Sequence, residues 1–156
     1  MRTRALLILI AVACRAGDAF GIWKVNPARS TSNGGSRIES FTLRISPHVK
    51  GEVFTLDKTE KDGRVTTEST ILYLDGKPRD FEEANCTGTQ SSRRLGKETV
   101  EIIRACSNGA WLRLVRRPAA QPRELILEIT ERQPGGRQVE RHFVMEKQEE
   151  EEEVKK

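Results

Sequence analysis

Residues 20–30 read Phe-Gly-Ile-Trp-Lys-Val-Asn-Pro-Ala-Arg-Ser, and this stretch decides the fold class. Its first part begins with the short apolar run Gly21-Ile22-Trp23. Pro27 must end that segment, because proline has no backbone N–H to give to a sheet. The segment is therefore predicted to be the first strand of a closed or nearly closed antiparallel sheet.

The remainder of the chain repeats a pattern of short strands and turns. Apolar and polar residues alternate over 41–46, which is the period of a half-buried strand. An Asp-Gly pair at 62–63 and an Asn-Gly pair at 108–109 indicate hairpin turns, whose central positions need positive φ. We count about nine strands and no amphipathic helix, a pattern typical of sandwiches and up-and-down barrels. Residues 26–37 and 80–88 are predicted to be loops.

Composition limits the size and the class of the protein. The chain has 156 residues, enough for one domain with a core of its own. Hydrophobic residues make up 36% and charged residues 32%, which fits a folded domain with a very polar surface. Aromatic residues are only 5%, which argues against a broad aromatic platform for sugars or bases. The predicted domains are a signal peptide at 1–19, a barrel at 20–148 and a disordered, glutamate-rich tail at 149–156.

The N-terminus indicates export. Arg2 and Arg4 precede an uninterrupted apolar run at 5–13, and Gly17 and Ala19 offer a cleavage site before residue 20. The run is shorter than the roughly 20 apolar residues that span a bilayer, so no transmembrane span is expected. The protein is predicted to be periplasmic or extracellular.

A second processing route stays open at the same segment. Residues 11–14, Ala-Val-Ala-Cys, form a loose lipobox in which Cys14 would be the lipidated N-terminus. Lipidation would anchor the domain to a membrane surface, whereas cleavage after Ala19 would release it.

Export also accounts for the odd number of cysteines. Once Cys14 has left with the signal or has been acylated, Cys86 and Cys106 remain, in a compartment that favours disulfides. A bond between them would stabilise the fold by about 3 kcal/mol on the chain-entropy model. The alternative is a pair of buried free thiols. Two cysteines cannot complete a zinc site of known ligand spacing, and we expect neither a metal nor a cofactor.

The chain resembles a group of bacterial secreted lipocalin-like proteins. That group opens with Gly-x-Trp-Lys-Leu-Asn and then a Lys/Arg-Ser pair, which residues 21–30 match. Further matches are Asp-Gly-Arg at 62–64, Tyr-Leu-Asp-Gly-Lys-Pro at 73–78, Thr-Val-Glu at 99–101, Gly-Arg at 136–137 and Glu-Lys at 146–147. The resemblance covers roughly residues 20–148 and implies a single antiparallel lipocalin-like (calycin-type) β-barrel of about 8–10 strands. It implies no catalytic residues.

The chain also departs from the wider lipocalin pattern. It lacks the Thr-Asp-Tyr segment expected in mid-chain, and its Cys86 and Cys106 are not part of the pattern. In calycin barrels the tryptophan of Gly-x-Trp plugs the closed end, with a basic side chain of the last strand on its ring. The resemblance gives Trp23 this structural role, beside Gly21, and makes Arg141 the candidate for the basic partner.

Five residues are candidates for ligand binding. Trp111 and Arg113 share one strand face, as Arg141 and Phe143 do on the last strand, and Tyr73 is the fifth candidate. If these faces point inward, an arginine could meet the carboxylate of a fatty acid or a similar anion. If they point outward, the arginines are solvated.

Two functions follow from these alternatives. The first is an exported barrel that binds a small apolar or amphipathic ligand, which can be anionic, in an interior of roughly 300 Å³ or more. The second is a structural or interaction protein with a filled barrel, docking an anionic envelope partner through a basic face. Eight basic residues against two glutamates between 89 and 123 supply that face.

Other classes of function are disfavoured. Export and the single tryptophan near the basic segment argue against nucleic acid. Only two histidines, His48 and His142, stand among scattered carboxylates, so an enzyme is not expected. We expect a monomer.

Overall fold

The computed structural model describes residues 19–34 and 38–149. The predicted signal peptide up to residue 18, the lipidation candidate Cys14 and the tail from residue 150 lie outside the described residues. Signal cleavage, lipidation and tail disorder therefore stay predictions.

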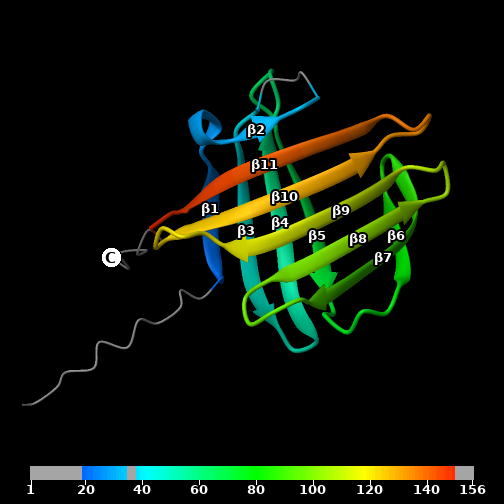
Figure 1. Ribbon diagram of the computed structural model, residues 1–156, viewed down its shortest axis with the longest axis horizontal. Coiled ribbons are helices and arrows are strands. Elements are labelled where there is room, and N and C mark those ends of the chain that lie inside the picture. The colour runs from blue at the N-terminus through cyan, green and yellow to red at the C-terminus, as the bar shows by residue number, and fades with distance from the viewer. Residues whose placement is uncertain (1–18, 35–37, 150–156) are drawn as a thin grey trace, which may run out of the picture.

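The described chain is all-β, and the predicted fold class is confirmed. Its elements in order are β1 (Gly21–Val25), the single-turn helix η1 (Pro27–Arg29), β2 (Thr31–Ser32), β3 (Phe41–His48), β4 (Gly51–Thr59), β5 (Val65–Leu72), β6 (Arg79–Glu83), β7 (Cys86–Arg94), β8 (Val100–Cys106), β9 (Trp111–Pro118), β10 (Glu124–Arg132) and β11 (Gln138–Lys147). All paired strands are antiparallel, in the order β5-β4-β3-β1-β11-β10-β9-β8-β7-β6, with β2 beside β11. In Figure 1, β8 to β11 cross in front of β3 to β5.

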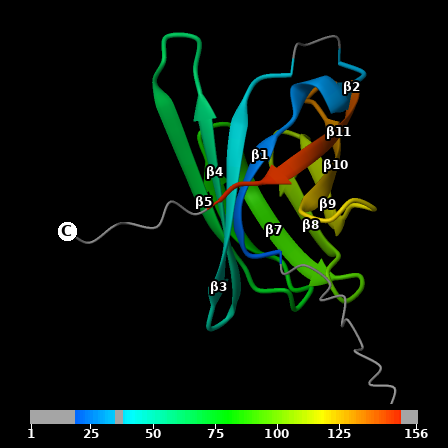
Figure 2. The same ribbon diagram turned by 90° about the vertical axis from the view of Figure 1, so that its left-hand side faces the viewer.

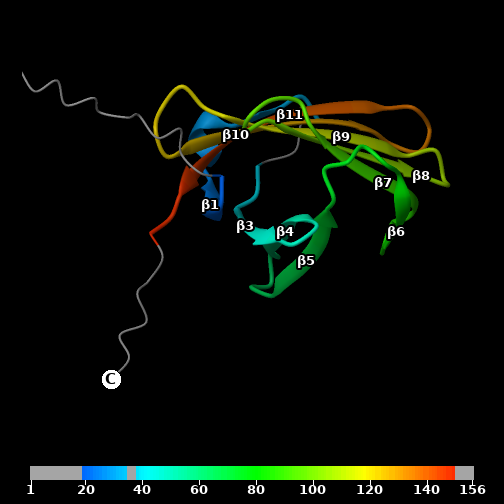
Figure 3. The same cartoon turned by 90° about the horizontal axis from the view of Figure 1, so that it is seen from below.

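The sheet curls round until its end strands β5 and β6 approach each other, as Figure 3 shows from below. Figure 2 shows from the side how β3 to β5 face β8 to β11 across the curled sheet. The end strands β5 and β6 do not pair. Instead, the segment after β5 joins β7: Asp75 forms a bridge with Arg93, and the Leu74 N–H donates to the Ser92 hydroxyl at 3.0 Å. The curled sheet is thus closed at one end by this contact with β7, and it is open between β5 and β6 at the other end.

Two segments predicted to be loops contain short elements. Residues 26–37 include η1, which the Asn26 side chain caps by accepting from the backbone N–H groups of Ala28 and Arg29, and the two-residue β2. Residues 80–88 include most of β6 and the start of β7. The pattern of β6 is hard to recognise because Phe81 is its only apolar residue, and its order comes from pairing with β7.

The interior of the barrel divides into a packed end and a hollow end. The packed end contains Trp23, Leu43, Ile45, Leu72, Val100 and Met145, each no more than 3% exposed. Beyond this layer the same strands carry inward side chains that surround a cavity instead of filling the space.

Trp23 occupies the packed end, as the resemblance implies. Its indole N–H donates to the Ala19 carbonyl at 2.8 Å, and Lys147 Nζ lies 5.4 Å from the ring centroid. The prediction that Arg141 is the basic residue on the Trp23 ring is wrong, because Arg141 lies further along β11 and pairs with Glu131. Gly21 makes room for Lys147, since a Cβ there would lie 2.9 Å from the lysine Cε.

Candidate functional site

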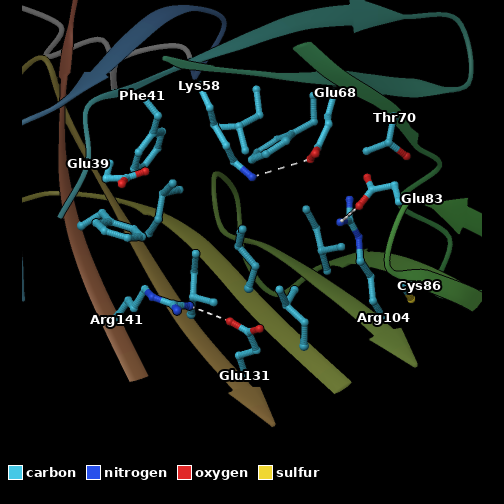
Figure 4. Close-up of a pocket in the computed structure, with 18 of the residues that line it drawn as sticks. Glu39, Phe41, Lys58, Glu68, Thr70, Glu83, Cys86, Arg104, Glu131 and Arg141 are labelled. Atoms are coloured by element: carbon cyan, nitrogen blue, oxygen red, sulfur yellow. Dashed lines mark hydrogen bonds and ion pairs between the residues drawn. The ribbon is translucent and has the colours of Figure 1, made fainter. Parts of the chain in front are cut away.

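The hollow end holds a cavity of about 690 Å³ with largely apolar walls (Figure 4). Its apolar side chains include Phe41, Phe54, Leu112, Leu114, Leu127 and Phe143. Phe41 and Phe143 meet edge to face, with ring centroids 5.0 Å apart. Such a surface suits a hydrocarbon body, because burying apolar area gains roughly 25 cal/mol per Å².

The register of the sheet explains why these residues share one space. Leu127 on β10 faces Phe143 on β11, and Ile129 faces Leu114 on β9. Alternate residues of each strand point inward, so pairing in register stacks the apolar positions of neighbouring strands on one face. On the β5 side the lining residues are polar, and two of them, Ser69 and Thr70, are small, which leaves space across the barrel.

Three ion pairs stand around this apolar centre. Arg141 Nη1 lies 2.6 Å from Glu131 Oε2, Arg104 Nη1 lies 3.1 Å from Glu83 Oε2, and Lys58 Nζ lies 3.8 Å from Glu68 Oε2. Figure 4 shows the pairs at three sides of the space, drawn from β10 and β11, β6 and β8, and β4 and β5. Every lysine and arginine among the described residues of the lining is therefore matched by a carboxylate.

Arg104 has the most enclosed charged group of the cavity wall. Its Nε donates to Gln90 Oε1 at 2.8 Å, and its guanidinium carbon lies 4.2 Å from the centroid of the Phe81 ring. Burial lowers the pKa of the Arg104 guanidinium, and Glu83 opposes this effect. Burial also raises the pKa of Glu83, against the pull of Arg104. Both shifts follow from the low polarity of the wall.

A buried ion pair crosses the floor of the barrel, at its packed end, from β4 to β9. Arg116 Nη1 lies 2.6 Å from Glu52 Oε2, and the two side chains are 1% and 3% exposed. The half-exposed Arg94 reaches Glu52 at 3.4 Å from the other side. Among the described residues, Arg116 Nε is the buried side-chain nitrogen or oxygen without a hydrogen-bond partner.

The structure separates the five predicted ligand residues. Arg141 and Phe143 line the cavity together. Trp111 and Arg113 alternate with the lining residues of β9 and lie on the other face of the sheet, where Arg113 Nε donates to Glu101 Oε2 at 2.6 Å. Tyr73 borders a smaller hollow of about 410 Å³ near the β5–β7 junction, under the guanidinium of Arg79.

Sequence reasoning missed the charged lining residues Glu39, Lys58, Glu68, Glu83, Arg104 and Glu131. The signal was present in the spacing. Arg104 follows the inward-facing Ile102 by two positions on β8, and Glu131 follows Ile129 by two on β10. A charge that continues an apolar face is a candidate for the mouth of a cavity.

The predicted disulfide between Cys86 and Cys106 is confirmed, with an S–S distance of 2.01 Å. It joins the first residue of β7 to the last residue of β8, and Cys86 lines the cavity. The bond therefore fastens the β6–β7 hairpin, which contributes Glu83, at the open end of the barrel.

The basic segment between 89 and 123 carries much less free charge than its composition suggests. Arg93 and Arg113 share the carboxylate of Glu101, which is 3% exposed on the outer face. Burial raises the pKa of Glu101, but the hydrogen bonds from the two arginines outweigh this effect and lower it overall. Arg104 and Arg116 point into the barrel.

The described residues contain neither a candidate metal site nor a membrane-spanning helix. No group of three or more histidine, cysteine or acidic residues there could hold a metal ion. No helix in that part of the chain has the length and apolar character needed to cross a membrane.

No protein-family model matches the chain, and no curated protein sequence matches it. Among solved structures, it is similar to the zebrafish ileal bile acid-binding protein complexed with cholic acid, with a TM-score of 0.50 and 13% sequence identity. The match covers 83% of this chain and 98% of that chain. At this identity the likeness shows the fold, a curled antiparallel barrel of the calycin kind. The bacterial group that the sequence resembles stays a prediction.

Proposed function

We propose that this protein binds one small apolar or amphipathic molecule in the cavity at the hollow end of its barrel. The observation that carries the proposal is the cavity itself: about 690 Å³ with mainly apolar walls, next to a fully packed end. Small-molecule sites typically measure roughly 300–1,000 Å³ and combine apolar walls with a few polar groups. A barrel with only a structural role would be expected to fill its inward positions with large side chains.

The comparison supports the same proposal. A solved structure that shares this fold is that of a bile acid-binding protein complexed with cholic acid. An amphipathic ligand would suit the present cavity, whose apolar centre is bordered by Arg141, Arg104 and Lys58 with their carboxylate partners.

The docking alternative has weaker support. It needs a basic outer face, yet Arg93 and Arg113 are paired with Glu101, and Arg117 is paired with Glu128 at 2.8 Å. Exposed pairs of this kind leave little net charge to attract a polyanion.

Export, a non-enzymatic role and an anionic ligand are the finer predictions that belong to this proposal. Export to an oxidising compartment agrees with the Cys86–Cys106 bond, and the proposal assigns no catalytic step to the cavity. The predicted anionic ligand would have to meet Arg141, whose guanidinium already has a carboxylate partner.

Native mass spectrometry of the protein purified from its own source tests the proposal. We expect a mass increment of one small molecule per chain. A Leu114→Trp variant places an indole in the apolar centre of the cavity and should lower the bound fraction, while Thr130→Trp, on the outer face of β10, should leave it unchanged. Absence of any bound mass, or an equal bound fraction in Leu114→Trp and the wild type, would refute binding in this cavity.

A further inference from the structure

The cations that line the cavity are each paired with a carboxylate of the wall, and this pairing restricts which head group a ligand can have. Arg141 and Arg104 each point one guanidinium nitrogen at a glutamate of the wall, at 2.6 Å and 3.1 Å. Lys58 faces Glu68 at 3.8 Å nearer the mouth. Among the described lining residues, the carboxylates Glu39, Glu68, Glu83 and Glu131 outnumber the three cations.

A carboxylate ligand would therefore enter a site whose cations are already neutralised. To reach Arg141 it would have to approach the carboxylate of Glu131, and two like charges repel strongly where the walls are apolar. To reach Arg104 it would meet Glu83 in the same way. Among the described lining residues, no cation is left unpaired for an anionic head group.

The same pairs are well suited to hydroxyl groups. Among the described residues, Arg104 Nη2 and Arg141 Nε and Nη2 donate to no protein acceptor, while each paired glutamate keeps lone pairs to accept further hydrogen bonds. A hydroxyl donates one hydrogen bond and accepts others, so it can bridge the two halves of an ion pair without adding charge. Because the pairs stand at separate sides of the cavity, several hydroxyls could be satisfied at once (Figure 4).

We propose that the cavity selects an amphipathic ligand whose head group is uncharged and carries hydroxyls, in preference to one that ends in a carboxylate. This inference rests on the proposed function and names the class of ligand for that site. It replaces the expectation that an arginine of the last strand binds an acidic head group, since Glu131 is the acceptor that Arg141 already has.

A panel with one hydrocarbon chain and three head groups tests the inference. Monododecanoylglycerol, dodecanoic acid and dodecylamine are titrated into the full mature protein at neutral pH, below their aggregation limits. We expect the glyceride to bind at least tenfold more tightly than the acid. Tighter binding of the acid or of the amine would overturn the head-group assignment while leaving the proposed function intact. No binding by any of the three would overturn the proposed function as well.

A charge-neutralising variant provides the reciprocal test. Glu131→Gln releases Arg141 from its countercharge, so the affinity for dodecanoic acid should rise at least fivefold, with little change for the glyceride. Glu128→Gln is the matched control, because Glu128 lies on the outer face of β10 and pairs with Arg117. Circular dichroism confirms that both variants fold. An unchanged preference in Glu131→Gln would contradict the role assigned to the wall pair.

Discussion

The buried pair of Glu52 and Arg116 offers the sharpest test of the packed end. Glu52→Gln leaves the Arg116 guanidinium without its main countercharge at a site that is 1% exposed. Removal of one partner of a buried pair costs about 3–5 kcal/mol, a large part of the roughly 5–15 kcal/mol that stabilises a domain. Arg94 adds little to this loss, because its side chain is 48% exposed.

The double variant Glu52→Leu/Arg116→Met separates the charge from the packing. It keeps apolar volume across the barrel and removes both charges, so its free energy of unfolding should return to near that of the wild type or exceed it. Urea unfolding at pH 7, followed by tryptophan fluorescence, measures all three proteins. A loss below about 1 kcal/mol in Glu52→Gln, or a double variant as unstable as the single one, would refute a buried pair at the barrel floor.

Three further predictions concern the sheet and its surface. Cys106→Ser should lower the free energy of unfolding by about 3 kcal/mol and make it insensitive to reductant, and equal stability with and without reductant in the wild type would contradict this. Glu101 has a lowered pKa, so its stabilising effect is complete above its ordinary value of 4.5 and is lost as the pH falls through the lowered pKa. The stability difference between wild type and Glu101→Gln should therefore shrink below pH 4.5 in urea titrations, and a difference that grows there would be inconsistent with the assignment. Gly51→Ala should weaken the β4–β5 pairing and raise amide exchange in β5, because φ is +149° and a Cβ would lie 1.9 Å from the Leu72 carbonyl oxygen; unchanged exchange would contradict this.

The fold could be predicted because its signals are local. The segment 21–25 and the Gly-containing turns at 62–63 and 108–109 act through backbone conformation within a few residues. The structure has β1 at Gly21–Val25, and Gly63 and Gly109 take φ values of 84° and 86°. β6 was missed because its order depends on β7, a partner that no local pattern reveals.

The candidate site could be predicted only in part. The sequence shows which residues of a strand share a face, but it does not show which face points into the barrel. The sequence groups Trp111 with Arg113 and Arg141 with Phe143, and both groupings are correct. Which group faces inward depends on the register of β9 against β10, and Thr130 opposite Arg113 belongs to the outer face. The outer face of β9, which carries Trp111 and Arg113, also carries Val115. Because Val115 is only 6% exposed, burial alone would not have separated the two faces.

The same limit explains why Arg141 was predicted beside Trp23, where the structure has Lys147. Both residues lie on the same face of β11, separated by three of the two-residue repeats of a strand. Pairing of Trp23 with Lys147 selects the nearer one, and that pairing spans almost the whole chain. Contacts between the first and last strands cannot be ranked without the register.

Titration with the neutral dye N-phenyl-1-naphthylamine tests the central claim, ligand binding inside the barrel, most directly. We expect saturable fluorescence enhancement with one dye per wild-type chain, weakened in Leu114→Trp and unchanged in Thr130→Trp, with both variants folded by circular dichroism. Non-saturating enhancement in the wild type, or equal binding by Leu114→Trp, would contradict it.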